Sequence, residues 1–434
     1  MDGETGVVVI DLGYERGEPD SYRNPGRSTV QSWFPALLMA ALLLVCAGAS
    51  DPPAKSPLSP VLRLQIGPAD AYALTSDGAL LAQTFGQLTS YNLEDGRIRW
   101  QAAQASPAFR LRLTDGLLLM RPWTTGLRDP GTTAVSLATG VSRWQRDGNV
   151  LTVTGSSALL AVEPVRSYAG ANRRVEGPID ALDPLTGRTR WTVNVPGSGV
   201  LLGVPGASGT AARMLLVHAG RTMALHDLRD GTRLAAAAIP AADYGPDNPA
   251  VAGGVIMLRH PGDTGMEISA YDPGSLRRLW TRPAYDAYVV KQCAQLACLI
   301  GQNGVRAIDP ATGYTRWMRP EWKDVEANGT MYVAYSGEAG HAPAALIDPG
   351  TGTMRVDLAG WRPVGGNGGE GHLLVTRAVD AGARTMVAVA RPGDREPRLL
   401  ADLPAGTGDC QAVPGRLVCR SMYGELVVWA YREG

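Results

Sequence analysis

Hydrophobic and polar residues alternate in short runs over most of the chain, and turn-forming residues separate the runs. Around residue 309 this pattern predicts four short strands, Tyr288–Gln292, Ala297–Gly301, Val305–Asp309 and Tyr314–Met318. A period of two puts every second side chain of a strand on the core face. No segment after residue 60 shows the hydrophobic period of a helix. The chain is therefore predicted to be all-β from this point on.

A nine-residue phrase recurs with the strands at intervals of 37 to 47 residues. Asp183-Pro-Leu-Thr-Gly-Arg-Thr-Arg-Trp191 returns almost unchanged as Asp309-Pro-Ala-Thr-Gly-Tyr-Thr-Arg-Trp317. Weaker copies keep the same length, namely Asn92–Trp100, Ser136–Trp144, Asp227–Ala235, Asp272–Trp280 and Asp348–Val356. A repeat of this length indicates a modular array rather than several unrelated domains.

The residue types of the phrase are those of a tight hairpin. Its Asp offers a side-chain oxygen to amides two residues on, the Pro pre-sets φ, and the Gly supplies left-handed backbone. The closing Trp is expected to cover the flank of a neighbouring sheet, which buries on the order of 150–250 Å². We therefore interpret these rings as structural rather than as a stacking platform for a cofactor: Trp100, Trp144, Trp191, Trp280 and Trp317.

The phrase resembles the repeat of the pyrroloquinoline-quinone-type (BamB-like) β-propellers, a family that includes quinoprotein dehydrogenases. The resemblance covers residues 61–434 and is strongest at 179–192 and 304–318. It implies a propeller of four-stranded antiparallel blades, and most members of the family are scaffolds that bind no quinone. The quinone enzymes usually have a disulfide between adjacent cysteines, a calcium site and a catalytic Asp. Because this shorter chain has no adjacent cysteines, the resemblance implies a scaffold without a cofactor.

The number of blades is open between eight, the family norm and the favoured number, and nine, the direct count of units. A last set of strands lacks its outer member: Gln411–Val413, Arg416–Arg420 and Leu426–Tyr431. At the other end of the array, Val61–Ile66 is a single strand of suitable length. Pairing the two would close the ring and remove its open edges.

The N-terminal segment determines the expected compartment. Trp33–Ala49 is a run of 17 residues without a charge, preceded by Arg23 and Arg27 and followed by Asp51. This is at the short end for a membrane helix, and the order of charges predicts a cytoplasmic N-terminus. We expect a cytoplasmic tail at 1–32, a single transmembrane helix at 33–49, a Pro/Ser-rich linker at 50–60 and an extracytoplasmic propeller at 61–434.

Two other interpretations of this segment stay open. Ala47-Gly48-Ala49 satisfies the pattern of a signal-peptide cleavage site, which would make the protein secreted. Against cleavage, the 32 residues before the apolar run include several acidic residues and are much longer than the N-terminal region of an ordinary signal peptide. Cys46 would suit a lipid anchor, but the preceding Val45 is a poor residue for lipidation.

The remaining four cysteines lie in two close pairs, Cys293/Cys298 and Cys410/Cys419. Each pair flanks a predicted turn, so a disulfide across each hairpin is expected in an oxidising compartment. Zinc binding is an alternative, although a closed site needs four ligands and no His clusters with either pair. Free buried thiols are the third possibility.

Composition and motifs exclude several classes of function. The 41 basic and 41 acidic residues cancel, which argues against nucleic acid binding. Basic residues are nearly all Arg, with Lys only at Lys55, Lys291 and Lys323, and together with the Ala and Gly content this suggests a high-GC bacterium. The five His residues are scattered, and neither a nucleophile elbow nor a phosphate-binding loop is present. We therefore predict no catalytic, cofactor-binding or metal-binding residue.

Long connections are predicted to gather on one face of the ring, where they would form the binding surface. They are Trp123–Thr132, Pro164–Pro178, Pro240–Pro249, Ser336–Pro343 and Arg362–Gly371. The candidate contacts on them are Trp123, Arg128, Tyr168, Arg173, Arg174, Tyr244 and His341. The adjacent Arg173 and Arg174 are also compatible with a plain solvated charge pair.

We expect the protein to be a membrane-anchored scaffold that binds an envelope protein or a glycan, with the membrane contact made through Trp33–Ala49. The alternative is an enzyme acting on cell-wall sugars, or a remnant quinoprotein, with its site in the central channel. A convergent cluster of ionisable residues in the channel would favour that alternative.

Overall fold

The computed structural model describes residues 37–41, 57–103, 108–122, 131–162, 173–205, 211–218, 221–337, 342–366, 371–380 and 383–432. The chain divides into two units, Met1–Lys55 and Ser56–Gly434. In the first unit, residues 37–41 form a short helix. None of the helical segments that the structure describes has both the length and the apolar character required to cross a membrane. The expected span Trp33–Ala49 and the tail 1–32 lie mostly outside the described residues.

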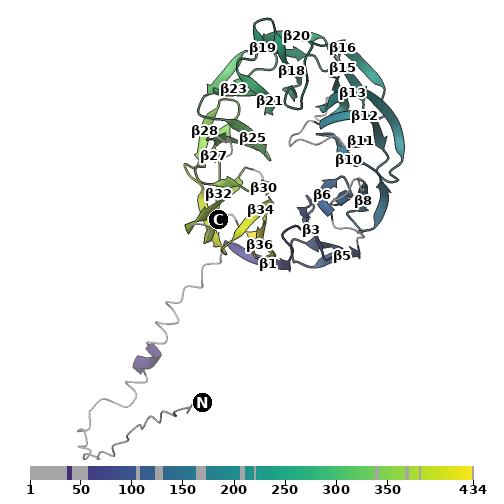
Figure 1. Ribbon diagram of the computed structural model, residues 1–434. Coiled ribbons are helices and arrows are strands. Elements are labelled where there is room, and N and C mark those ends of the chain that lie inside the picture. The colour runs from purple at the N-terminus through teal and green to yellow at the C-terminus, as the bar shows by residue number, and fades with distance from the viewer. Residues whose placement is uncertain are drawn as a thin grey trace, which may run out of the picture. The chain divides into compact units, whose positions relative to one another are not determined.

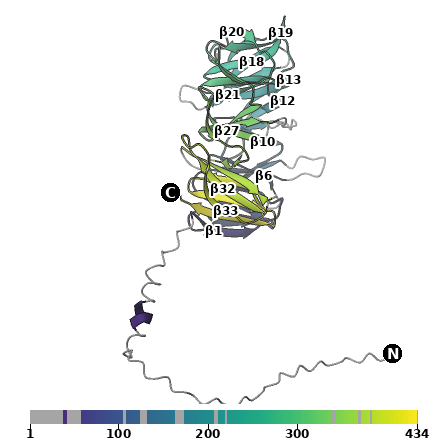
Figure 2. The same cartoon turned by 90° about the vertical axis from the view of Figure 1, so that its left-hand side faces the viewer.

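The second unit consists of antiparallel sheets arranged around a common axis, as expected for a β-propeller (Figure 1), and Figure 2 shows the ring from its side. Two sheets come first in the chain: β2 Tyr72–Leu74, β3 Ala79–Thr84, β4 Gln87–Asn92 and β5 Ile98–Ala103, then β6 Ala108–Thr114, β7 Leu117–Pro122, β8 Thr132–Ser136 and β9 Ser142–Arg146. In each, the strands pair in chain order, so each sheet is a simple up-and-down unit.

The next sheet has seven strands: β10 Asn149–Thr152, β11 Leu159–Val162, β12 Arg173–Leu182, β13 Thr189–Pro205, β14 Ala211–His218, β15 Thr222–Asp227 and β16 Arg233–Ala238. The sheet has this many strands because the long strand β13 joins two sets of strands. Residues from Thr189 onward pair with β12, whereas Gly199 to Pro205 pair with β14. The sheet therefore contains two four-stranded units that share one strand. Residues Arg173 to Glu176 of β12 pair with the part of β13 that begins the β13–β16 unit, so they extend that unit at its inner edge.

Three further sheets repeat the same order: β17 Pro249–Ala252, β18 Val255–Gly262, β19 Gly265–Tyr271 and β20 Arg278–Pro283, then β21 Ala287–Cys293, β22 Leu296–Gly301, β23 Gly304–Ile308 and β24 Thr315–Arg319, then β25 Asp324–Asn328, β26 Met331–Ser336, β27 Ala342–Asp348 and β28 Thr353–Asp357. The middle one confirms the strands predicted around residue 309 to within one residue. No α-helix occurs in the described residues after position 60, as the hydrophobic pattern indicates.

The last two sheets join the ends of the ring. One contains β29 Arg362–Pro363, β31 Leu373–Val379, β32 Arg384–Ala390 and β33 Arg398–Leu403; the other contains β30 Gly365–Gly366, β34 Thr407–Val413, β35 Arg416–Ser421, β36 Glu425–Tyr431 and β1 Leu58–Gln65. The N-terminal β1 pairs with the C-terminal β36, from Leu58 opposite Tyr431 to Gln65 opposite Glu425. This confirms the predicted closure. The strand starts within the expected linker, because an edge strand tolerates Pro60 at a register shift.

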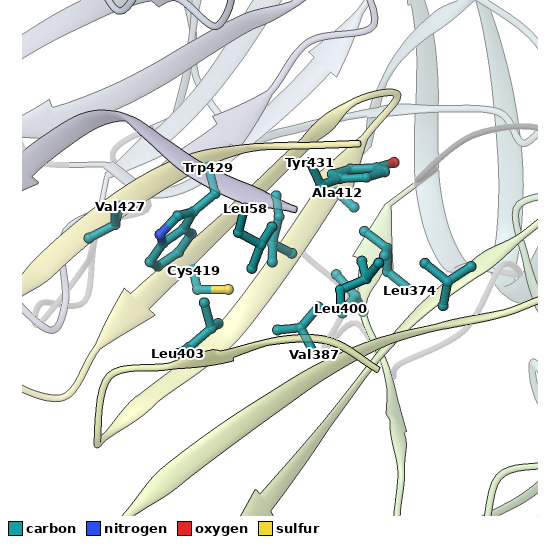
Figure 3. Packing of buried hydrophobic residues seen from close by; sticks show 13 residues of the cluster. Leu58, Leu374, Val387, Leu400, Leu403, Ala412, Cys419, Val427, Trp429 and Tyr431 are labelled. Atoms are coloured by element: carbon teal, nitrogen blue, oxygen red, sulfur yellow. The ribbon is translucent and has the colours of Figure 1, made fainter. Parts of the chain in front are cut away.

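Buried apolar residues fill the space between neighbouring sheets. Figure 3 shows the cluster between the last two sheets, in which Leu58 of β1 packs with Trp429 and Val427 of β36 and with Leu403 of β33. Trp429 is 6% exposed. The closing strand is thus held by side-chain packing as well as by backbone pairing.

The tryptophans of the phrase connect each sheet to the next one. The indole Nε1 of Trp317 donates a hydrogen bond to the backbone oxygen of Pro349, at 2.9 Å, in the following phrase. The others do the same: Trp100 to Leu137 at 2.8 Å, Trp144 to Pro184 at 2.9 Å, Trp191 to Leu228 at 3.2 Å and Trp280 to Pro310 at 2.9 Å. The acceptor is always the second residue of the next phrase, so the rings are structural, as interpreted from the sequence.

The glycine of each phrase has a second role beyond its left-handed backbone. Gly352 has φ of +65° and lies so close to Trp317 that a Cβ there would be 2.6 Å from a ring atom. The corresponding glycines lie equally close to the preceding Trp, namely Gly140, Gly187, Gly231 and Gly313. We call this arrangement the Trp–Gly junction.

In one junction the large and the small residue have exchanged places. Ala235 stands where a Trp is expected on β16, and Leu276 stands where the next phrase should have its Gly. Leu276 keeps the left-handed φ of +56° and is 2% exposed, within the cluster against which Ala235 packs. The large side chain therefore comes from the opposite sheet and fills the junction from that side.

Candidate binding surfaces

The direction of the strands separates two edges of the ring. In each unit the first-to-second and third-to-fourth connections leave one edge, which we call the turn edge because it contains the phrases. The second-to-third connections and those between units leave the other, the loop edge. Because Leu58 pairs with Tyr431 at the end of β36, the chain enters the ring at the turn edge. The amide of Arg432 donates to the backbone oxygen of Pro57 there, at 3.0 Å.

Two of the predicted long connections meet at the loop edge. Arg174, near the start of β12, has its Nη2 atom 3.8 Å from a carboxylate oxygen of Asp243, in the connection before β17. The Asp243 side chain is 90% exposed, so this ion pair contributes little stability. Arg174 Nε is buried and makes no hydrogen bond with the described residues. Arg173 is half-buried beside it and has interactions of its own.

The other predicted contacts have different outcomes. Tyr244 is not available to a partner, because it is 2% exposed and packs in the cluster around Leu276. Its hydroxyl donates to the backbone oxygen of Pro240 at 2.8 Å, and burial raises its pKa. The prediction of a surface ring is therefore wrong at this position. Four candidates lie outside the described residues: Trp123, Arg128, Tyr168 and His341.

One predicted loop belongs to the opposite edge. The segment Arg362–Gly371 was assigned to the loop edge, but it connects β29 to β31, the first and second strands of their sheet. First-to-second connections leave the turn edge, so this assignment is wrong. Within the segment, Gly365 and Gly366 pair in parallel with Gln411 and Ala412 of β34 and connect two neighbouring sheets.

A charged group that the sequence did not reveal lies on two adjacent inner strands. Lys291 of β21 places its Nζ 2.8 and 2.7 Å from the two carboxylate oxygens of Asp324 on β25. Glu326 lies 3.9 Å from the same Nζ. Burial, with the nearby charge of Glu326, raises the pKa of Tyr335 to about 12. The only sequence signal was the rarity of Lys, which occurs at just three positions.

This group has a structural explanation. Both carboxylate oxygens of Asp324 accept hydrogen bonds from the Lys291 ammonium group, so this side chain is directed at a neighbouring strand rather than at an open site. Lys291 and Asp324 also belong to different sheets, so their ion pair connects two blades. In the described part of the chain, no three His, Cys, Asp or Glu side chains are placed to hold a metal ion.

A buried Ser–His pair has the atoms of a catalytic dyad but not its setting. His260 Nε2 is 2.8 Å from Ser269 Oγ, which is 2.8 Å from Thr281 Oγ1. The second ring nitrogen of His260 contacts the backbone oxygen of Pro261 at 2.8 Å rather than a carboxylate. His260 and Ser269 are 3% and 0% exposed, so no substrate carbonyl can reach the hydroxyl. These residues satisfy one another's hydrogen bonds within the β18–β20 strands.

Both predicted disulfides are present. Cys293 and Cys298 bridge the hairpin of β21 and β22, and Cys410 and Cys419 bridge β34 and β35. Three of the four sulfur-bearing side chains are fully buried, and Cys410 is half-buried. The zinc and free-thiol alternatives for these pairs are thereby excluded. Cys46 lies outside the described residues.

Comparisons with known proteins identify the family of this chain. A family model described as outer membrane protein assembly factor BamB matches residues 55–198 and again 175–330. No curated protein matches the chain. The crystal structure of BamB from Moraxella catarrhalis aligns with a TM-score of 0.42 at 15% identity, covering 87% of this chain and 98% of that chain. Since the two family matches together span more than half of the sequence, the chain belongs to the BamB family of pyrroloquinoline-quinone-type repeat proteins.

Proposed function

We propose that this protein is a binding scaffold in the envelope of a bacterium, with its loop edge as the surface for a protein or glycan partner. The observation that carries the proposal is the opposition of the two edges. The chain enters the ring at the turn edge, through Pro57 and Leu58, and Arg174 and Asp243 bring two extended connections together at the loop edge. The family description, an assembly factor of the outer membrane, supports a partner that is a protein.

We propose further that Trp33–Ala49 anchors the chain in the membrane, with residues 1–32 in the cytoplasm. The apolar run and the order of its flanking charges support an anchor, and the two disulfides support an oxidising compartment for the ring. Secretion after cleavage near Ala49 is the competing proposal. N-terminal sequencing of the protein from its native membrane separates them, because a chain beginning at Ser50 would rule out the anchor.

The blade number follows from how β13 is treated. We count the two units that share it as separate blades, which gives nine, because each has its own phrase and its own junction. Counting hydrogen-bonded sheets gives the eight that the family norm favours.

The charged group at Lys291 does not favour the enzyme alternative, since its Lys is paired with Asp324.

The test is capture of partners from native membranes by the full-length protein. A loop-edge variant, Arg173→Glu with Arg174→Glu, is expected to lose a partner that the wild type retains. The matched control is Arg97→Glu on the turn edge, an Arg whose side chain is 86% exposed. If the loop-edge variant and the control capture the same partners as the wild type, the loop edge is not the binding surface.

A further inference from the structure

A pocket of about 270 Å³ lies at the loop edge, between the sheet that closes the ring and the connection that enters this sheet from β33. Pro404 and Ala405 of the connection form one wall. Val427 and Trp429 of β36 line the pocket from the sheet, and Figure 3 shows both in the cluster beside it. They are only 5% and 6% exposed, so the pocket reaches the edge of the buried core. Its floor is therefore apolar.

Two opposite charges line the same pocket and are not paired with each other. Arg63 of β1 lies opposite Val427 of β36, and Glu425 lies two residues before Val427. The two charged residues are therefore diagonal neighbours on one face of the sheet. Arg63 is exposed and Glu425 is half-buried, and neither side chain forms a hydrogen bond or an ion pair with another described residue. The pocket thus presents a free cation and a free anion beside its apolar floor.

The neighbouring sheet shows that this spacing permits an ion pair. Arg384 of β32 and Asp402 of β33 have the same diagonal relationship, because Met386 lies opposite Asp402. The Nη1 atom of Arg384 lies 3.3 Å from a carboxylate oxygen of Asp402. The backbone spacing therefore does not by itself keep Arg63 and Glu425 apart. A molecule with both a carboxylate and an ammonium group would satisfy both side chains, and hydrogen bonds between charged groups are roughly twice as strong as neutral ones.

We propose that this site, the closing-sheet pocket, binds a free α-amino acid with an apolar side chain. Arg63 holds the carboxylate, because a planar guanidinium group matches the geometry of a carboxylate, and Glu425 holds the ammonium group. The apolar side chain of the ligand lies on Val427 and Trp429. The volume is just below the roughly 300–1,000 Å³ of ordinary ligand sites, which suits so small a molecule. A peptide does not match this chemistry, because a peptide bond removes one of the two adjacent charges.

The test is a titration of the full chain, with ¹⁵N-labelled indole groups, by L-leucine. We expect a saturable shift of the Trp429 Nε1–H signal, which a Trp429→Phe variant assigns. Two analogues of leucine each lack one charge: 3-methylbutylamine has no carboxylate, and 4-methylpentanoate has no ammonium group. Each should bind at least about tenfold more weakly, because it leaves one charged side chain without a partner. A Trp429 signal that does not move up to the solubility limit of leucine would overturn the proposal, and equal affinity for the three compounds would overturn the assignment to an amino acid.

Two charge variants test the location of the ligand. Arg63→Gln should bind leucine about tenfold more weakly but 3-methylbutylamine as the wild type does, and Glu425→Gln should lose affinity for leucine but not for 4-methylpentanoate. Arg384→Gln and Asp402→Asn are the matched controls on the neighbouring sheet and should bind leucine as the wild type does. Wild-type affinity for leucine in the folded charge variants would contradict the site. Arg174 of the proposed partner surface does not line this pocket, so either proposal can fail alone.

Discussion

Trp317 lies directly over Gly352 of the next sheet, at a separation that leaves no room for even a methyl group. Replacing Gly352 by Ala should therefore cost both the left-handed strain, about 1–2 kcal/mol, and the overpacking, about 1–3 kcal/mol. Gly78 is the matched control, because its φ is +79° but a Cβ there meets nothing within 4 Å. Chemical denaturation should show a clearly larger loss for Gly352→Ala than for Gly78→Ala. Equal losses would mean that the Trp317 side chain moves to make room for the added methyl group.

The exchanged junction predicts a strong coupling between two substitutions. Ala235→Trp alone adds an indole side chain beside Leu276 and should lower the free energy of unfolding of the propeller by about 1–3 kcal/mol. Leu276→Gly alone leaves a gap and should cost about 2–5 kcal/mol. Together they rebuild a Trp–Gly junction and also relieve the positive φ of Leu276.

The double variant should therefore be more stable than the sum of the two single effects by roughly 0.5–3 kcal/mol, the range of contacting pairs. Equilibrium denaturation of the four proteins completes the cycle. Additive effects would show that Ala235 and Leu276 do not share one junction. A matched pair at an unrelated site, Leu234→Ala and Leu399→Ala, should be additive, since both side chains are half exposed.

Stability at acidic pH should depend on the carboxylates of the phrase. Arg316 donates to Asp309 at 2.5 Å, and this hydrogen bond holds the pKa of Asp309 below its ordinary value. A carboxylate with a lowered folded-state pKa stabilises the fold above its unfolded-state pKa, about 3.9. That contribution disappears as the pH falls through the folded-state value.

The variant Asp309→Asn tests this, because Asn92 has the same place in the first phrase and accepts the amide of Glu94 at 3.1 Å. The variant should be less stable than the wild type near pH 7, and the difference should shrink below about pH 4. Arg316→Gln should give a parallel curve. A difference that persists unchanged to pH 2 would exclude the ion pair as its cause.

The two disulfides should respond differently to reductant. Cys293 and Cys298 are fully buried, whereas Cys410 is half-buried, so attack by a thiol should open the Cys410–Cys419 bond first. Loss of either bond should lower the free energy of unfolding by roughly 2–3 kcal/mol, as expected for loops of this length. Alkylation of the folded protein under increasing reductant, followed by mass spectrometry, gives the order. Labelling of Cys293 before Cys410 would contradict it.

Local pattern was sufficient for most of the architecture. The turn chemistry of the phrase located the hairpin around Asp309, and the unpaired strand near Val61 found its partner in β36. The same reasoning failed at β29, because a two-residue strand, Arg362–Pro363, has no hydrophobic alternation to detect. Its connection was therefore placed at the wrong edge.

The candidate surface was less accessible to sequence analysis, because exposure and proximity depend on contacts distant in the chain. Tyr244 is buried by packing with a different sheet, which its loop composition does not show. Lys291 and Asp324 are 33 residues apart and meet only because β21 and β25 are neighbours in the ring.

The closure of the ring by β1 has a consequence for biosynthesis. Arg420 donates to the backbone oxygen of Gly67, a residue 353 positions earlier in the chain. A ribosome therefore completes every other blade before the first strand acquires its partner, and during that time the edge of β1 and the apolar face of Leu58 have no cover. Contacts between such distant segments form slowly. The strand that is synthesised last, β36, therefore converts an open array with an unpaired, aggregation-prone edge into a closed propeller.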